Sequence, residues 1–208
     1  TLDNPPDLSG VISISLSVNC FNSCDGELTF QVNNILSGTS PYTYSIDGVS
    51  FQNSPIFTGL CGDTMYSITV MDANGCTFNA NKFLPEPTQI SFSDSLSDYN
   101  GFNISCFGLS DGSIHFQNIS GGNSPYTYSI DGSNFSTTNP FTGLSAGTYS
   151  ITAMDASGCT EATLITLTEP DEFLINVIID NSISCPGICD GEVSVSPTNG
   201  VAPILYTM

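Results

Sequence analysis

The chain has almost no positive charge. Its 208 residues contain one cation, Lys82, against 20 aspartates and glutamates, which gives a formal net charge of −19. Nucleic-acid binding requires clustered lysines and arginines that displace counterions, and docking onto anionic lipid depends on basic clusters. The charge therefore excludes both kinds of partner. The acidic residues are spread singly through a sequence that is 39% hydrophobic, which indicates a folded surface and not a disordered acidic tail.

Long apolar runs, tryptophan and catalytic side chains are also scarce. The longest apolar stretch, Phe173 to Ile179, is interrupted by Asn176 and is too short to span a bilayer. Because no leader sequence opens the chain, we expect any export signal to lie outside it. The one histidine, His115, is expected on the water-facing side of a strand, and Lys82 is the one amine. We predict that the protein is not an enzyme and assign no catalytic residues.

The chain repeats itself with a period in the eighties. The octapeptide PYTYSIDG at 41–48 returns at 125–132, which is 84 positions later, and FTGL at 57–60 returns at 141–144. A period of this length fits one small domain per repeat. Partial copies of the same motifs are expected at 2–5 and 203–206. The predicted divisions are the end of a preceding repeat (1–6), a first repeat (7–87), a second repeat (88–170) and a truncated third repeat (171–208).

Within each repeat, apolar and polar residues alternate. Ile12, Ile14 and Leu16 point one way and the serines between them point the other, which is typical of an antiparallel strand with one face in water. Turn signals such as Asp25-Gly26 separate these stretches. Six or seven short strands in about 83 residues predict an all-β fold of tandem immunoglobulin-like β-sandwich repeats, arranged end to end. The stretch 144–149 also resembles a tyrosine corner, in which a tyrosine at a strand start bonds to backbone upstream.

The cysteines recur at equivalent positions, which predicts disulfides formed in an oxidising compartment. The second repeat contains only Cys106 and Cys159. If each repeat is self-contained, these two bond to each other. Their counterparts in the first repeat, Cys20 and Cys76, are then expected to bond in the same way.

A second pair of cysteines is present in one repeat and absent from the other. Cys24 and Cys61 are replaced together by Ser110 and Ser145, and a joint gain or loss predicts one Cys24–Cys61 bond. This bond would close a loop of 37 residues (61 − 24), for which the chain-entropy model predicts about 4 kcal/mol of stabilisation. The cysteines of the third repeat are Cys185 and Cys189. We expect each to bond to a cysteine that lies beyond Met208.

Metal binding is the alternative use of these residues. Cys20-x-x-x-Cys24 has zinc-like spacing, but the second repeat lacks its second cysteine and no histidine lies near, so disulfides are favoured. The recurring aspartates, such as Asp47 and Asp72, are each followed within three residues by glycine, which favours turns over calcium. We assign no cofactor. The candidates for calcium are the acidic residues near the repeat junctions: Glu86, Glu169, Asp171 and Glu172.

Read in order, the motifs of one repeat are Cys, Asp-Gly, Pro-Tyr-x-Tyr-Ser-Ile-Asp-Gly, Phe-x-x-Leu, Gly-x-Tyr, Asp-Ala-x-Gly-Cys and Glu-Pro. This order resembles the SprB repeat of very large cell-surface adhesins of Bacteroidota, including gliding-motility adhesins. The resemblance covers essentially the whole chain. The resemblance implies type IX secretion, extracellular display at the cell surface and adhesion. We expect a disulfide-stiffened stalk or filament segment whose partners are neighbouring repeats and other copies in a filament. A four-residue insertion before Cys106 and the extra cysteine pair depart from the pattern.

Glycan binding through exposed aromatic side chains is the alternative function. The recurring aromatics occupy scaffold positions in both repeats, which favours core packing, and the chain has no tryptophan. They are Tyr42, Tyr44, Phe51 and Phe57, with their copies Tyr126, Tyr128, Phe135 and Phe141. The resemblance further implies O-glycosylation at Asp-Ser/Thr-apolar sites, for which Thr64 and Ser95 are the candidates.

Overall fold

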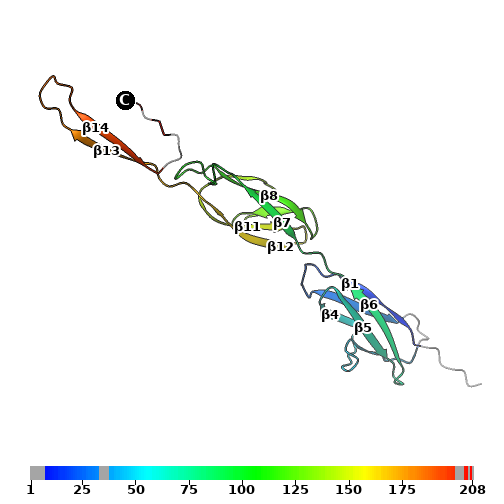
Figure 1. The fold of residues 1–208 in the computed structure, drawn as a ribbon. Coiled ribbons are helices and arrows are strands. Elements are labelled where there is room, and N and C mark those ends of the chain that lie inside the picture. Colours follow the sequence, from blue (N-terminus) through cyan, green and yellow to red (C-terminus); the bar gives the residue numbers. More distant parts are fainter. Residues whose placement is uncertain (1–7, 33–37, 200–203, 206, 208) are drawn as a thin grey trace, which may run out of the picture. The chain divides into compact units, whose positions relative to one another are not determined.

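The computed structural model describes residues 8–32, 38–199, 204, 205 and 207, and their regular elements are all β-strands (Figure 1). Contacts divide the chain into two compact units. Unit 1 comprises Thr1–Ser91, Ser120–Tyr126 and Met154–Glu161, and unit 2 comprises Phe92–Ile119, Thr127–Ala153 and Ala162–Met208. The all-β prediction is confirmed, whereas the predicted repeat boundaries and their end-to-end arrangement stay predictions. The motif copy at 2–5 and most of that at 203–206 lie outside the described residues.

The first repeat contains two three-stranded antiparallel sheets. One sheet has the order β1-β2-β4 and the other has the order β3-β5-β6. The strands of the first sheet are β1 (Gly10–Leu16), β2 (Gly26–Val32) and β4 (Ile56–Leu60). Those of the second are β3 (Thr43–Ser45), β5 (Thr64–Met71) and β6 (Thr77–Leu84).

The core of the first repeat is built by alternate residues from both sheets. Leu28 and Phe30 of β2 belong to the same buried cluster as Ile68 and Val70 of β5. The ring of Phe30 lies 5.9 Å from that of Tyr44 on β3. Because each fully buried side chain of this size contributes about 1.5–3 kcal/mol, this packing makes the two sheets one sandwich, as the alternation of the sequence predicts.

The second repeat uses the same design. Its sheets have the orders β10-β8-β7 and β12-β11-β9, and the ring of Phe116 on β8 lies 4.8 Å from that of Tyr128 on β9. The four-residue insertion forms a tight turn in which Tyr99 pairs with Phe102. The strands are β7 (Ser91–Leu96), β8 (Gly112–Ser120), β9 (Thr127–Ser129), β10 (Phe141–Leu144), β11 (Gly147–Met154) and β12 (Thr160–Leu167).

The third repeat provides one antiparallel hairpin, formed by β13 (Leu174–Asn181) and β14 (Glu192–Thr198). Its register repeats that of β1 and β2: the shift between Ile179 and Asn181 corresponds to the shift between Ile14 and Leu16. Every residue of β13 is exposed to solvent. The hairpin therefore carries an uncovered apolar face.

Tyrosine corners occur in both complete repeats. The hydroxyl of Tyr149 donates to the carbonyl of Ser145 over 2.9 Å, as predicted from the sequence. The hydroxyl of Tyr66 donates to the carbonyl of Cys61 over 3.0 Å. The bonded residues are five positions apart in the first repeat and four in the second, so the first repeat accommodates one extra residue inside the corner while keeping the hydrogen bond.

Candidate functional site

The Cys24–Cys61 disulfide is present, as predicted. In the second repeat, the hydroxyls of Ser110 and Ser145 occupy the equivalent positions and lie 2.7 Å apart, within hydrogen-bond distance. The same two loops are thus joined covalently in one repeat and by a hydrogen bond in the other.

The other cysteines do not pair as predicted. Cys20 is bonded to Cys159, while Cys76 and Cys106 are free and exposed. The predicted Cys20–Cys76 and Cys106–Cys159 bonds are therefore wrong. Cys185 and Cys189 are also free and exposed, so their pairing beyond Met208 stays a prediction.

The length of the β5–β6 hairpin explains the error. The amide of Asn22, two residues after Cys20, donates to Glu86 over 3.1 Å, which places this loop at the hairpin end where Thr64 pairs with Leu84. Cys76 lies at the opposite end, next to the pairing of Met71 with Thr77. Strand β5 has eight residues, so at about 3.3 Å per residue the two ends are roughly 25 Å apart. A disulfide requires Cα atoms within about 7 Å, and bonding within the repeat is impossible.

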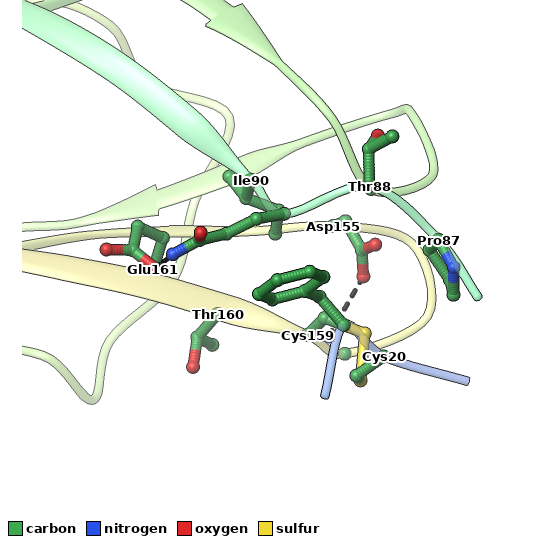
Figure 2. Close-up of a pocket in the computed structure, with 12 residues that line it drawn as sticks. Cys20, Pro87, Thr88, Ile90, Asp155, Cys159, Thr160 and Glu161 are labelled. Atoms are coloured by element: carbon green, nitrogen blue, oxygen red, sulfur yellow. Dashed lines mark hydrogen bonds between the residues drawn. A yellow bond between two sulfur atoms is a disulfide. The ribbon is translucent and has the colours of Figure 1, made fainter. Parts of the chain in front are cut away.

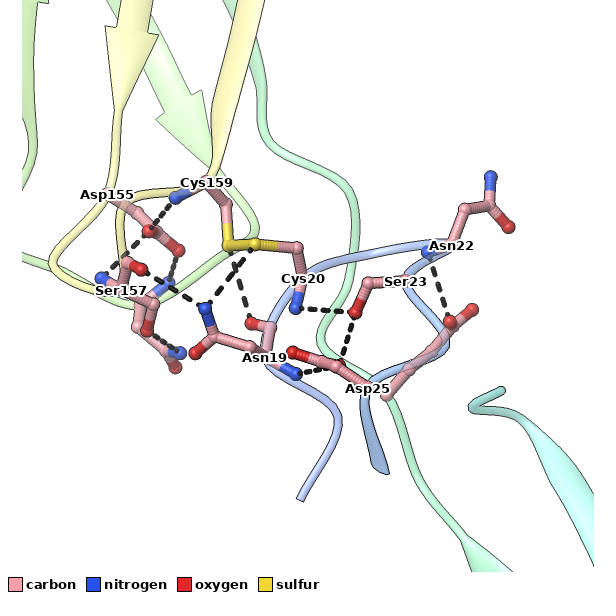
Figure 3. Close-up of a disulfide and its surroundings, with 10 residues drawn as sticks. Asn19, Cys20, Asn22, Ser23, Asp25, Asp155, Ser157 and Cys159 are labelled. Atoms are coloured by element: carbon pink, nitrogen blue, oxygen red, sulfur yellow. Dashed lines mark hydrogen bonds between the residues drawn. A yellow bond between two sulfur atoms is a disulfide. The ribbon is translucent and has the colours of Figure 1, made fainter. Parts of the chain in front are cut away.

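The Cys20–Cys159 bond lies within unit 1 and joins two loops (Figure 3). The first is formed by residues 19–25 of the β1–β2 loop, and the second is the β11–β12 turn, residues 155–159. The side-chain amide of Asn19 donates to the carbonyl of Ser157 over 3.2 Å, and the carbonyl oxygen of Asn19 lies 3.3 Å from the sulfur of Cys159. The disulfide is thus accompanied by polar contact between the same loops.

A buried aspartate holds the Cys159 turn in shape. One carboxylate oxygen of Asp155 accepts the amides of Ser157 and Cys159, both over 2.9 Å, and the other accepts the amide of Asn123 over 2.8 Å. Asp155 is only 4% exposed. Since three backbone amides use both oxygens, this residue is a turn-forming group, as the spacing of the Asp-Ala-x-Gly-Cys motif predicts.

A hollow of about 290 Å³ adjoins the disulfide (Figure 2). Phe21, beside Cys20, contributes to its lining together with Ile90 and Gly122. At its edge, the side-chain amide of Gln89 donates to the carboxylate of Glu161 over 3.2 Å. The hollow therefore combines an apolar lining with acids that already bind protein groups, an arrangement suited to packing of the Cys20 loop.

The predicted calcium residues have structural partners. Glu86 accepts the amide of Asn22 and Glu169 accepts the amide of Gly108, over 3.1 and 2.7 Å. Asp171 is exposed. In the described part of the chain, no three His, Cys, Asp or Glu side chains are grouped as a metal site would require. The four candidates, including Glu172, are therefore not brought together as such a group.

The Asp-Gly sites form turns in which the aspartate accepts hydrogen bonds. Asp47 accepts the amides of Ser50 and Val49 over 2.7 and 2.8 Å, and these bonds hold its pKa well below the ordinary value. Asp131 has the same role in the second repeat, where the amide and side chain of Asn134 are the main cause of its low pKa. The turn interpretation agrees with this geometry.

The recurring aromatics mainly support the cores. Tyr44 and Phe57 are each 8% exposed, and the ring of Phe141 lies 6.2 Å from that of Phe116. Their predicted use in packing agrees with this burial. Phe51 is more accessible, at 37% exposed.

The remaining candidate residues lie on strands. His115 lies between the buried residues Ile114 and Phe116, so its ring points away from the core. Thr64 and Ser95 are half-buried. The hydroxyl of Thr64 donates to the carbonyl of Gly62 over 2.9 Å, and that of Ser95 accepts from Gln117 over 3.0 Å. Their glycosylation stays a prediction.

Sequence reasoning missed Asn19, Phe21 and Ser157, which surround the Cys20–Cys159 bond. Phe21 has a copy, Phe107, after the equivalent cysteine, and this recurrence of Cys-Phe was the available signal. Asn19 and Ser157 had no such signal, because Ser105 and Asn74 stand at the equivalent positions.

No helix of the described residues is long and apolar enough to cross a membrane. A family model, the SprB repeat, matches residues 102–135. The predicted resemblance to the SprB repeat is confirmed for this stretch. The matched stretch runs from the loop that contains Cys106 through β8 and β9 to the turn formed by Asp131.

Among solved structures, the chain is similar to one described as "Protocadherin Gamma B7 extracellular cadherin domains 1-4 P21 crystal form". The identity is 16% and the TM-score 0.25, over 78% of this chain and 51% of that one. The match thus spans about half the length of the cadherin chain, and a TM-score this low carries no argument. No curated protein matches.

Proposed function

We propose that the chain is a structural stalk segment of a large secreted surface adhesin, stabilised by disulfides and without catalysis. The observation that carries this proposal is the Cys20–Cys159 bond, whose sequence separation is 139 residues. A pulling force applied to the two ends passes through this covalent bond and does not extend the residues between the cysteines. Most of the chain therefore cannot be extended by tension while the bond is intact, which is what a stalk requires.

Two further features support an extracellular role. Disulfides persist in oxidising environments such as the cell surface, and the chain contains two of them. The SprB repeat, matched at 102–135, is the basis for proposing type IX secretion and a place in a gliding-motility or related adhesin. The partners in this proposal are neighbouring repeats and other copies of the chain.

Force spectroscopy on the whole chain, held at its two ends, tests the stalk proposal. At about 3.4 Å per residue, the Cys20–Cys159 bond should withhold roughly 470 Å of extension until a reductant is added. Without reductant, Cys159→Ser should release only roughly 350 Å of this length, because the Cys24–Cys61 bond inside it still closes a loop of 37 residues. Cys76→Ser, which removes a free thiol, should behave like the unchanged chain. Full extension of the unreduced, unchanged chain would contradict the proposal.

Glycan binding has less support, because Tyr44 and Phe57 are buried. A glycan array incubated with the intact chain separates the two functions. A stalk segment should bind no glycan, and saturable binding that is lost on heating the protein would favour the lectin-like alternative.

A further inference from the structure

The two loops joined by Cys20–Cys159 each have a copy elsewhere in the chain. We call residues 19–25 a docking loop, and its copy is 105–111. We call residues 155–159 a receiving loop, and its copy is 72–76. The copies contain Cys106 and Cys76, which are both free and exposed.

The copy of the docking loop has the same internal structure as the original. The amide of Leu109 donates to the carbonyl of Cys106 over 3.2 Å, as that of Ser23 does to Cys20 over 3.0 Å. The amide of Gly108 is bound by Glu169, as that of Asn22 is bound by Glu86. The loop is therefore already folded into the shape that the first repeat uses at its disulfide.

This copy also has the aromatic side chain that follows the bonded cysteine in the original. Phe107 stands where Phe21 stands in the first repeat, and Phe21 lines the hollow beside Cys159. Phe107 is 51% exposed and follows the free thiol of Cys106 directly. This copy therefore has an exposed aromatic beside an exposed thiol, where the original has Phe21, 41% exposed, beside the bonded Cys20.

The copy of the receiving loop is equally well formed. Asp72 accepts the amides of Asn74 and Cys76, both over 2.9 Å, and that of Thr39 over 2.9 Å. These bonds correspond one by one to those of Asp155. The thiol of Cys76 is thus held on the same kind of turn as the sulfur of Cys159.

The residues packed beside the receiving loop also have counterparts in the first repeat. A Cβ placed on Gly122 would lie 2.6 Å from Asp155 and 2.8 Å from Ile90, and all three residues line the hollow. A Cβ placed on Gly38 would lie 3.1 Å from Asp72 and 2.9 Å from Leu8. Gly38 and Leu8 thus lie beside Asp72 as Gly122 and Ile90 lie beside Asp155.

We propose that the Cys106 docking loop binds the Cys76 receiving loop of a second copy of this chain, and that a Cys106–Cys76 disulfide closes the contact. Among the described residues, the free-thiol copies of the docking loop contain Cys106 and Cys185, and the free-thiol copy of the receiving loop contains Cys76. Cys106 is chosen because Phe107 follows it, whereas Pro186 follows Cys185. The contact joins two different surfaces and can therefore continue from copy to copy. Phe107 packs against the Asp72 turn as Phe21 does beside Asp155. On bond formation, the two thiols lose two protons and two electrons to a small disulfide such as oxidised glutathione, which leaves as two thiols.

The test mixes two full-length variants in oxidised glutathione. One keeps the docking thiol (Cys76→Ser, Cys185→Ser, Cys189→Ser), and the other keeps the receiving thiol (Cys106→Ser, Cys185→Ser, Cys189→Ser). Random pairing would place about half of the disulfide dimers in the mixed species, whereas docking raises the effective concentration of the complementary thiols. We expect a severalfold excess of the mixed dimer over both like dimers together, with Cys76–Cys106 peptides identified by mass spectrometry.

Matched variants separate docking from simple thiol reactivity. Phe107→Ser should bring the dimers back to random pairing, while Leu109→Ser, which introduces the residue that the first repeat has at this position, should keep the excess. Native Cys20–Cys159 and Cys24–Cys61 peptides confirm that each variant is folded. Random proportions with Phe107 present, or a majority of like dimers, would overturn the proposal.

Discussion

The first and second repeats hold the same two loops together in different ways. Both tie the loop before β2 or β8 to the loop before the tyrosine corner, the first with Cys24–Cys61 and the second with Ser110 and Ser145. The corner itself is the same, since Tyr66 and Tyr149 bond to backbone in both. The difference teaches that the covalent bond is an addition to a sandwich that closes without it.

The first and third repeats differ in a complementary way. The hairpins β1–β2 and β13–β14 share their register and their irregularity, but Leu28 is 0% exposed and its counterpart Val193 is 57% exposed. Hairpin geometry is therefore local, whereas burial comes from the second sheet, β3-β5-β6, which packs on the first hairpin.

Exchanging the cysteine and serine pairs should have the largest effect on stability. Replacing Cys24 and Cys61 by serine should lower the free energy of unfolding of the first repeat by about 4 kcal/mol, because the bond closes a loop of 37 residues. Replacing Ser110 and Ser145 by cysteine should raise that of the second repeat by about 2–4 kcal/mol. Urea unfolding monitored by amide exchange in each repeat measures both.

The single variants Cys24→Ser and Ser110→Cys are the controls for this exchange. Ser110→Cys creates no bond and should leave the second repeat close to its original stability. If the double cysteine variant bonds but is no more stable, native-state strain outweighs loop closure and the two repeats are not interchangeable at this position.

Truncating one apolar side chain should destabilise the covered hairpin, β1–β2, more than the uncovered hairpin, β13–β14. Leu28→Ala should cost about 3 kcal/mol, because it leaves a cavity in a packed core. Val193→Ala, at the matched position of β14, should cost less than about 0.5 kcal/mol. Amide exchange of β2 and β14 provides the two values. Equal costs would mean that β14 is covered in solution.

Acid should weaken the Asp-Gly turns, with the smallest of the expected effects. Hydrogen bonds to the carboxylate lower the pKa of Asp131 in the folded state, so its contribution to stability is present above the ordinary aspartate pKa and is lost as the pH falls below it. The stability difference between the unchanged chain and Asp131→Asn should therefore be greatest near neutral pH and should shrink below about pH 4. Denaturation of the second repeat over a pH series measures it.

Asp47→Asn, which alters the equivalent turn of the first repeat, is the matched control. It should change the pH profile of the first repeat and leave that of the second unaltered. A pH-independent difference for Asp131→Asn would show that the turn depends on side-chain shape and not on its charge.

Much of the fold could be predicted from local sequence. The alternation of Ile12, Ile14 and Leu16 predicted a strand because side chains in a strand point to opposite faces in turn. Asp-Gly pairs predicted turns because aspartate binds its own backbone and glycine accepts the required conformation. The joint replacement of Cys24 and Cys61 predicted their bond, since neither half of a disulfide is useful alone.

What the sequence by itself determined was therefore the repeat, the strands, the turns and one disulfide, all of which depend on neighbouring residues or on joint presence. The partner of Cys20 was decided only by the tertiary structure. Bond formation depends on distance in space, and an eight-residue strand separates Cys20 from Cys76, whereas folding of unit 1 brings the Cys159 turn to it. For the same reason, the sequence of the β13–β14 hairpin does not show that its apolar face is bare, because burial requires a second sheet packed against it.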